Sequence, residues 1–299
     1  MKLTTALGLS TLVAFVAAAE PQTCSSLEVR REWRTFSKAE RKGWIDAVNC
    51  LNKKPRTGKL QLPVDTQSYP ESFHIAPLNE SSTYYDDLVY AHMNLNPLIH
   101  WTGLFLPWHR VYLHEWTNIL RKECGLGPHK LRRRYIQFPF GGSSVSAEST
   151  FTPAEIEVVL SKTNFTSFHG YLEQLSGMHS AIHLIMGGDM GTVCPAGTSG
   201  TIYCPRERSP TFSANEPMFH LHHGNIDRLW WLWQEKSTDN KNAFHGGSVQ
   251  NTSSLDIFPN GQAPWLNKSS IVPSAGLWPT YNIGETLDTR SWPWCYVYE

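Results

Sequence analysis

The sequence predicts a mainly α-helical protein with long irregular connections. Apolar residues recur at helical spacing in five segments, and proline or glycine stands at several of their ends. The chain after residue 237 is rich in Pro, Gly, Asn and Ser instead, which predicts loops with short strands. No repeat, low-complexity stretch or linker divides the 299 residues, of which 40% are hydrophobic, so a single packed domain is expected.

The five helical segments are residues 38–53, 83–95, 107–124, 166–186 and 217–236. The second segment is expected to end before Asn96 and Pro97, because proline disfavours helical backbone in the residue before it. The third is expected to begin with Pro107, since proline suits the first helical position. The fourth is expected to end at Gly187 and Gly188.

The first nineteen residues have the pattern of a secretory signal. Lys2 precedes a short apolar run, and Ala17-Ala18-Ala19 forms a cleavage site. The run is too short to span a bilayer. We therefore expect residues 1–19 to be a signal peptide, residues 20–299 to be one domain, and the protein to be secreted and extracellular.

Sequons and cysteines agree with secretion. The four sequons begin at Asn79, Asn164, Asn251 and Asn267. All six cysteines lie after the signal, an even number that suits three disulfide bonds in an oxidising compartment. Six cysteines allow 15 pairings, and only Cys194 with Cys204, across a Gly-rich loop, is predicted here.

Charge gives no reason to expect a polyanionic partner. Lys and Arg number 26 and Asp and Glu number 26, so the formal net charge is zero. Neither nucleic acid nor an anionic membrane is therefore expected as a partner.

Two histidines share one face of the fourth segment. His179 and His183 are four residues apart, about 40° around a helix, so both rings leave the same face and can bind one ion. The spacing resembles that of a zinc protease helix. Ser180 stands where that motif carries its glutamate general base, which weighs against a hydrolase.

The fifth segment offers three further histidines. His220 and His223 share a face, while His222 points about 100° away from His223, and spacing alone does not choose among them. Asp227 lies one turn beyond His223, where a carboxylate can fix the orientation of a metal-bound imidazole. The tryptophans that follow, at positions 230, 231 and 233, are predicted to pack in the core.

Three more histidines lie upstream. His100 and His109 are nine residues apart, on opposite sides of any single helix, but Gly103 and Pro107 break the chain between them. His100 is therefore expected in a connection and His109 in the first turn of a new helix. With His92 near the end of the preceding helix, three imidazoles can converge from three segments. The remaining histidines, at positions 74, 114, 129, 169 and 245, are predicted to be structural.

Two sets of imidazoles, without cysteine or carboxylate, suit copper or zinc and not calcium or magnesium. Three protein ligands leave a coordination position open at each ion, as in catalytic or gas-binding sites. Two open sites side by side imply a substrate that bridges both ions.

The chain also carries long motifs in a fixed order. They are "VRREWRTFSKAERKGWIDAVNCL", "YDDLVYAHMN", "FLPWHR", "HLIMGGDMG", "EPMFHLHHGNIDRLWWLWQ" and the terminal "CYVY". In these motifs the chain closely resembles the type 3 copper proteins, specifically the short secreted fungal-type tyrosinases and catechol oxidases, which are polyphenol oxidases. The resemblance covers most of the chain after the signal.

The resemblance implies a four-helix bundle with a central dicopper site and long irregular loops, with two copper ions as the cofactor. Such enzymes use dioxygen to oxidise small phenolic substrates, converting o-diphenols to o-quinones, and true tyrosinases also hydroxylate monophenols. The resemblance assigns the metal ligands to His92, His100 and His109 for one copper and to His179, His183 and His223 for the other.

It further places three side chains near the substrate entrance, Ser180, Leu184 and Phe219, and gives Asp227 the role of supporting a ligand. Many tyrosinases of this group carry Asn where this chain has Ser180, which favours diphenol oxidation over monophenol hydroxylation here. Leu98 stands where some relatives carry a cysteine bonded to the second histidine, which excludes that thioether. Only Glu299 follows Tyr-Val-Tyr, so no C-terminal latency domain is expected.

The largest departure lies between the two sets of histidines. Family members carry an aromatic run of Tyr and Trp after the third segment, whereas residues 138–151 read "FPFGGSSVSAESTF". Only the 69 residues 110–178 separate His109 from His179. The chain is then either a minimal variant or one that lacks a segment. Two alternatives to an oxidase follow: a reversible dioxygen carrier of hemocyanin type, which uses the same six ligands, and an inactive or truncated family member.

Overall fold

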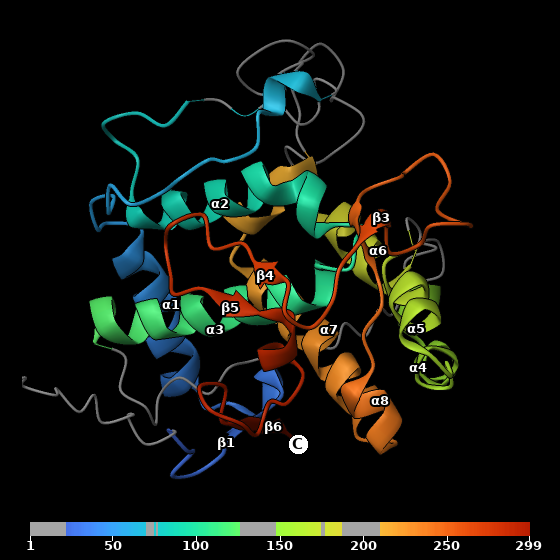
Figure 1. Ribbon diagram of the computed structural model, residues 1–299. Coiled ribbons are helices and arrows are strands. Elements are labelled where there is room, and N and C mark those ends of the chain that lie inside the picture. The colour runs from blue at the N-terminus through green and yellow to red at the C-terminus, as the bar shows by residue number, and fades with distance from the viewer. Residues whose placement is uncertain (1–21, 70–74, 76, 126–147, 175–176, 187–209) are drawn as a thin grey trace, which may run out of the picture.

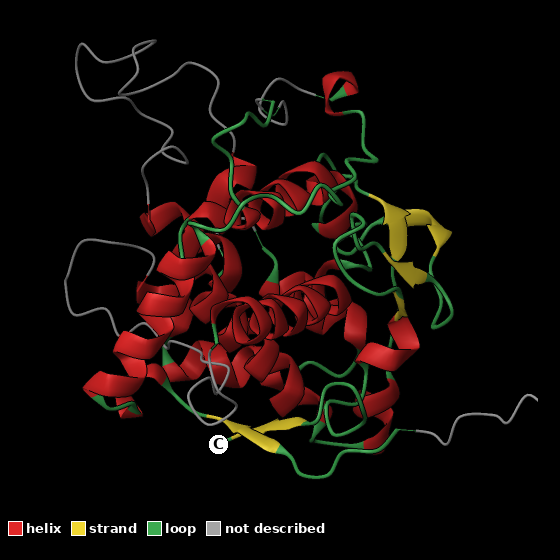
Figure 2. Cartoon of the chain, turned by 90° about the vertical axis from the view of Figure 1, so that its left-hand side faces the viewer, coloured by secondary structure: helices red, strands yellow, loops and turns green. Residues whose placement is uncertain are grey.

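The computed structural model describes residues 22–69, 75, 77–125, 148–174, 177–186 and 210–299. Its helices are α1 (Lys38–Leu51), α2 (Tyr84–Ile99), α3 (Phe105–Cys124), α4 (Pro153–Leu160), α5 (Phe165–Leu172), α6 (Met178–Met186), α7 (Met218–Gln234) and α8 (Thr238–Asn242). Helices fill the middle of the molecule, and strands are short and peripheral (Figures 1 and 2). The prediction of a mainly α-helical protein is confirmed.

The strands of the described chain form three two-stranded sheets. They are β1 (Glu28–Arg30), β2 (Gly247–Val249), β3 (Gln262–Trp265), β4 (Ile271–Val272), β5 (Tyr281–Asn282) and β6 (Tyr296–Tyr298). β2 pairs with β3 and β4 with β5, both antiparallel. β1 pairs with β6 in parallel, in the register Val29 to Val297, and so joins the two ends of the described chain (Figure 2).

Capping residues explain where α1 and α2 begin. The Ser37 side chain accepts a hydrogen bond from the Glu40 backbone N–H, and the Glu40 carboxylate accepts one from the Ser37 backbone N–H. Thr83 and Asp86 form the same reciprocal pair before α2. Such pairs satisfy two of the donors that a helix start leaves open, and they place carboxylates near its positive end.

Three predicted boundaries are wrong. α2 continues through Pro97 to Ile99, so the proline did not end the helix where the sequence predicted. α3 begins at Phe105, two residues before Pro107. The segment predicted as one helix over 166–186 is two helices, α5 and α6, with residues 173–177 between them.

α4 was not predicted at all, although its start carries a recognisable signal. The Thr152 side chain accepts a hydrogen bond from the Glu155 backbone N–H, and Pro153 occupies the first helical position. The helix is only eight residues long, too short for a periodic pattern to stand out.

The core has two apolar clusters. One lies among α1, α2, α3 and the chain after residue 270, and includes Trp108 and Trp278. The other lies between α5 and α7, and includes Phe168, Trp230 and Trp233. Trp230 and Trp233 are fully buried, as predicted, and the partly buried Trp231 packs against the first cluster. Together these clusters hold α2, α3, α6 and α7 around the histidines.

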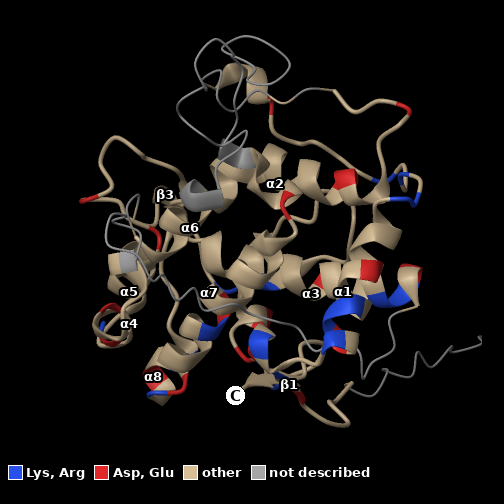
Figure 3. Cartoon of the chain, turned by 180° about the vertical axis from the view of Figure 1, so that it is seen from behind, with Lys and Arg blue, Asp and Glu red and all other residues tan. Residues whose placement is uncertain are grey.

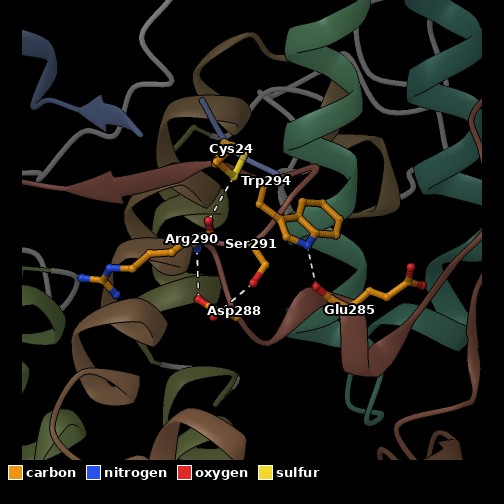
Figure 4. Close-up of a disulfide and its surroundings, with 7 residues drawn as sticks. Cys24, Glu285, Asp288, Arg290, Ser291 and Trp294 are labelled. Atoms are coloured by element: carbon orange, nitrogen blue, oxygen red, sulfur yellow. Dashed lines mark hydrogen bonds between the residues drawn. A yellow bond between two sulfur atoms is a disulfide. The ribbon is translucent and has the colours of Figure 1, made fainter. Parts of the chain in front are cut away.

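Two disulfides join distant parts of the described chain. Cys24 bonds Cys295, 271 residues away, beside the β1–β6 pair, and Cys50 on α1 bonds Cys124 at the end of α3. Near the first of these, the Trp294 indole N–H donates to the Glu285 carbonyl oxygen (Figure 4). The predicted Cys194–Cys204 pair lies outside the described residues, as does the predicted signal peptide.

The double variant Cys24→Ser/Cys295→Ser is expected to lose about 2–4 kcal/mol of unfolding free energy, because this bond restricts the unfolded chain over nearly its whole length. Guanidinium unfolding followed by tryptophan fluorescence measures the change. A change below about 0.5 kcal/mol, the scatter of ordinary surface substitutions, would contradict the expectation.

Charged residues of both signs are interspersed along α1 (Figure 3), where Lys42 pairs with Asp46 one turn later. Among the described residues, no helix is both long enough and apolar enough to cross a membrane.

Candidate metal centre

A first histidine group lies at the meeting point of α2 and α3. It consists of His92 on α2, His100 at the C-terminal cap of that helix and His109 on α3. All three are at least 95% buried, and their nearest ring nitrogens lie within 4.8 Å of one another. As predicted, His100 leaves the helix; His109 lies in the second turn of α3, because that helix starts earlier than expected.

A second histidine group lies between α6 and α7. It consists of His179, His183, His222 and His223, again with nitrogens within 4.8 Å of one another. The Nε2 atom of His183 lies 3.0 Å from Nε2 of His179 and 3.1 Å from Nε2 of His223. Three Nε2 atoms therefore converge on one point, contributed by two helices.

The two groups touch. The rings of His109 and His223 are stacked at 11° with centroids 4.3 Å apart, and those of His100 and His179 are 5.8 Å apart at 27°. Histidines as far apart in the sequence as residues 92 and 223 thus lie together in the interior of the fold. The described residues include all six histidines that the sequence had singled out as ligands.

His222 is held differently from its neighbour. Its Nε2 atom lies 3.0 Å from the carbonyl oxygen of His179, which can only accept, so this nitrogen carries a proton and ties α7 to α6. His220 faces elsewhere: its ring stacks on Trp116 at 3.8 Å and on Tyr112 at 5.7 Å. Spacing did not choose among the three histidines of α7. Of these three, His223 is the one whose Nε2 lies next to that of His183.

The site keeps its imidazoles neutral. Burial lowers the pKa of His100 and His109 well below the ordinary value of 6.5, and neighbouring imidazoles lower it further. The same causes act on His179, His183 and His223. Each of these five rings therefore has a lone pair at neutral pH, the form that binds a metal ion.

The donor set fits metal ions. Two nitrogens that each lie about 2.0–2.1 Å from one ion can be at most about 4.2 Å apart. The separations of 3.0 and 3.1 Å in the second group are within that limit. In the first group, the Phe105 carbonyl oxygen accepts from His109 Nδ1 at 2.8 Å, and the buried Nε2 of His109 has no hydrogen-bond partner in the described chain. Its lone pair is therefore available to bind a metal ion.

The family model described as the common central domain of tyrosinase matches residues 82–140 and 140–236, about half of the chain, and these residues carry both histidine groups. The chain belongs to the tyrosinase family. This is a family of oxidoreductases of polyphenol oxidase type, and its fold implies a copper-binding site.

Relatives and solved structures agree with this family. Tyrosinase-like protein phomQ1 of Diaporthe leptostromiformis is 27% identical over 355 residues, covering 93% of this chain and 79% of that protein. N-acetyl-6-hydroxytryptophan oxidase ivoB of Emericella nidulans is 23% identical, covering 97% and 99%. A polyphenol oxidase structure from Thermothelomyces thermophila shares the fold, with a TM-score of 0.56 and 17% identity, covering 91% and 89% of the two chains.

The comparisons also show that this tyrosinase-family chain lacks residues that a relative has. The alignment with phomQ1 spans 355 positions, more than the 299 residues of this chain, so it includes positions that only the relative fills. The two family-model matches meet at residue 140, inside the stretch where the sequence departs from the family pattern. Despite this shortening, the described residues of α2, α3, α6 and α7 bring both histidine groups together.

Two buried phenylalanines each contact both groups in this tyrosinase-family chain. The ring centroid of Phe105 lies 4.9 Å from that of His109 in the first group and 4.8 Å from that of His179 in the second. Sequence reasoning missed Phe105, because an apolar residue next to a helix start has no distinguishing pattern. Its position four residues before His109, on the same helix face, was the available signal.

Phe219 is the second of these residues. Its ring lies 4.9 Å from His92 and 4.1 Å from His223, and its side chain is only 3% exposed. It therefore packs inside the centre, and its place near a substrate entrance stays a prediction. Ser180 on α6 is half-buried, and the Leu184 side chain lies outside the described residues.

Asp227 does not support a histidine, contrary to the prediction. Its Oδ1 accepts from Arg110 Nε at 2.6 Å, and its Oδ2 accepts from Arg30, Tyr296 and Tyr298 at 2.5–2.6 Å. These partners come from α3, β1 and β6, and none of them is a histidine. The carboxylate instead anchors α7, the helix that carries His223, to the β1–β6 pair.

Proposed function

We propose that this chain is a secreted dicopper oxidase that converts o-diphenols to o-quinones with dioxygen, with monophenol hydroxylation as a weaker activity. The observation that carries the proposal is the stacking of two buried histidine groups on each other. Each o-diphenol gives up two electrons and two protons, so two diphenols reduce one dioxygen to two waters. Copper, when bound, supplies the redox chemistry that joins these half-reactions.

His92, His100 and His109 would hold one ion, and His179, His183 and His223 the other. The convergence of three Nε2 atoms supports the second set, and the hydrogen bond from His222 Nε2 to a carbonyl oxygen supports its exclusion. The buried surroundings exclude water and keep the imidazoles neutral, which favours ligation. Phe105 and Phe219 pack against histidines of both sets.

Phenolic substrates are supported by the relatives. The polyphenol oxidase shares the fold, and ivoB is described as an oxidase of N-acetyl-6-hydroxytryptophan, which carries a hydroxyl on an aromatic ring. Secretion is supported by the signal pattern of residues 1–19 and by two disulfides in the described chain.

Catechol oxidation by the copper-loaded protein tests the proposal. Oxygen consumption and quinone absorbance are recorded together, and steady turnover at one dioxygen per two quinones is expected. Reversible oxygenation without quinone would support a dioxygen carrier of hemocyanin type instead. Copper-loaded protein that neither consumes oxygen nor oxygenates would support an inactive family member.

Ser180→Asn is expected to raise the ratio of monophenol to diphenol oxidation, by roughly tenfold, about 1.4 kcal/mol in relative barrier height. An amide beside His179 can hold a water that takes the phenol proton, whereas the shorter serine reaches less far. Initial rates on tyramine and dopamine measure the ratio, with Ser180→Ala as the matched control. An unchanged ratio would count against a role for this position.

A further inference from the structure

A cleft of about 450 Å³ lies outside the metal centre, between α5 and the loop that joins β2 to β3. Both segments are on the right-hand side of Figure 1. They approach closely because Gly170 on α5 has no side chain: a Cβ there would lie 2.6 Å from Cβ of Pro259 in the loop. The volume is in the range of small-ligand sites.

Trp101 contributes an aromatic ring to the cleft and is held in an uncommon conformation. Its φ is 48°, in the left-handed region that bulky residues rarely adopt. Its indole N–H donates to the carbonyl oxygen of Glu173 at 2.9 Å, which fixes the ring. Backbone strain of this kind collects at functional positions.

Tyr171 contributes the second ring. Its hydroxyl donates to Glu155, and the Lys162 ammonium lies 4.2 Å from its centroid. Both side chains are half-buried and hydrogen-bonded, which restricts the orientation of their rings before any ligand arrives. Preorganised aromatic surfaces lose little entropy on binding.

The polar lining is balanced in charge. Lys162 and Asp256 carry opposite charges, and burial raises the pKa of Glu173 well above its usual value. Thr166 and Gln174 add a hydroxyl and an amide. The lining thus suits a neutral ligand with apolar faces and hydrogen-bonding edges.

We propose that this cleft binds carbohydrate, a chain of neutral hexose or N-acetylhexosamine rings. A pyranose ring has C–H faces that stack on aromatic rings and hydroxyl edges that bond polar side chains. Two sources fit. One is the protein's own N-linked glycan at Asn164, the exposed N-terminal cap of α5, in a sequon whose Thr166 lines the cleft. The other is a free oligosaccharide.

Binding of N,N'-diacetylchitobiose and of cellobiose to the whole protein, by isothermal titration calorimetry, tests the proposal. It does not depend on copper or on oxidase activity. The two sources are separated with Asn164→Gln, which removes the sequon. If both forms bind disaccharide, the cleft takes free oligosaccharide; if only Asn164→Gln binds, the protein's own glycan fills the cleft. If neither form binds either disaccharide at millimolar concentrations, the proposal is overturned.

Ring stacking is tested in the form that binds. Tyr171→Ala is expected to weaken binding at least tenfold, whereas Tyr171→Phe, which keeps the ring, should bind within about threefold of the parent. Trp265→Ala removes an exposed aromatic residue outside the cleft and should change nothing. Equal affinities for Tyr171→Ala and its parent, or an equal loss in Trp265→Ala, would overturn the assignment.

Discussion

His223→Ala is expected to lower the copper content from two ions per chain to one and to reduce catechol oxidation at least about 100-fold. Loss of a residue that merely supports a metal ligand costs 10- to 100-fold in affinity or activity, and loss of the ligand itself costs no less. The Nε2 of His223 lies 3.1 Å from that of His183, so its removal takes one of three converging donors from the second ion.

His222→Ala is the matched control, because the two histidines are adjacent and equally buried. His222 donates its Nε2–H to the carbonyl oxygen of His179 and therefore supports α6 without contributing that nitrogen to an ion. This variant should keep two coppers per chain at saturating copper, with weaker affinity. Metal analysis after desalting measures both variants. Equal copper losses in the two would contradict the assignment of His223.

Asp227→Asn is expected to destabilise the protein by about 3–5 kcal/mol, because breaking a buried ion pair leaves its charge uncompensated. Here two buried arginines, Arg30 and Arg110, would lose their counter-charge at once. Denaturant unfolding measures the loss. Asp46→Asn, which removes an exposed partner of Lys42, should change stability by less than about 0.5 kcal/mol. Similar effects of the two substitutions would contradict the anchoring role.

The same carboxylate has a predictable pH dependence. Burial alone would raise the pKa of Asp227, but Arg110, Arg30 and two tyrosine hydroxyls outweigh it and hold the pKa below 3.8. A lowered acid pKa contributes stability that is present above the unfolded-state value and lost as pH falls through the folded-state value. Below about pH 4, the free energy of unfolding should therefore decrease less with falling pH in Asp227→Asn than in the parent.

Sequence periodicity was sufficient for the long helices and insufficient for their interruptions. Apolar residues recur at helical spacing in α1, α2, α3 and α7, as expected of helices that pack one face against a core. Pro97 was a misleading stop signal, because a proline removes one backbone hydrogen bond and need not end the helix that contains it. The division between α5 and α6 had no strong local signal, since residues 173–177 contain a single glycine, and helical apolar spacing continues on both sides.

The candidate site was predictable where its histidines share a helix and harder to predict where contacts join distant parts of the sequence. His179 and His183 follow from spacing, and the family resemblance supplied the choice of His223. The partners of Asp227 lie at positions 30, 110, 296 and 298, so no local pattern joins them to it. Phe105 and Phe219 acquire their place between the histidine groups only from the packing of α3 against α6 and α7.

Copper content per chain tests the central claim most directly. The purified, folded protein is loaded with copper and freed of excess metal. Elemental mass spectrometry then gives the copper concentration, and amino-acid analysis gives the protein concentration. The assembled histidine groups predict two coppers per chain. Less than one copper per folded chain would contradict the account, because it would mean that histidines which lie together in the fold do not form a dinuclear centre.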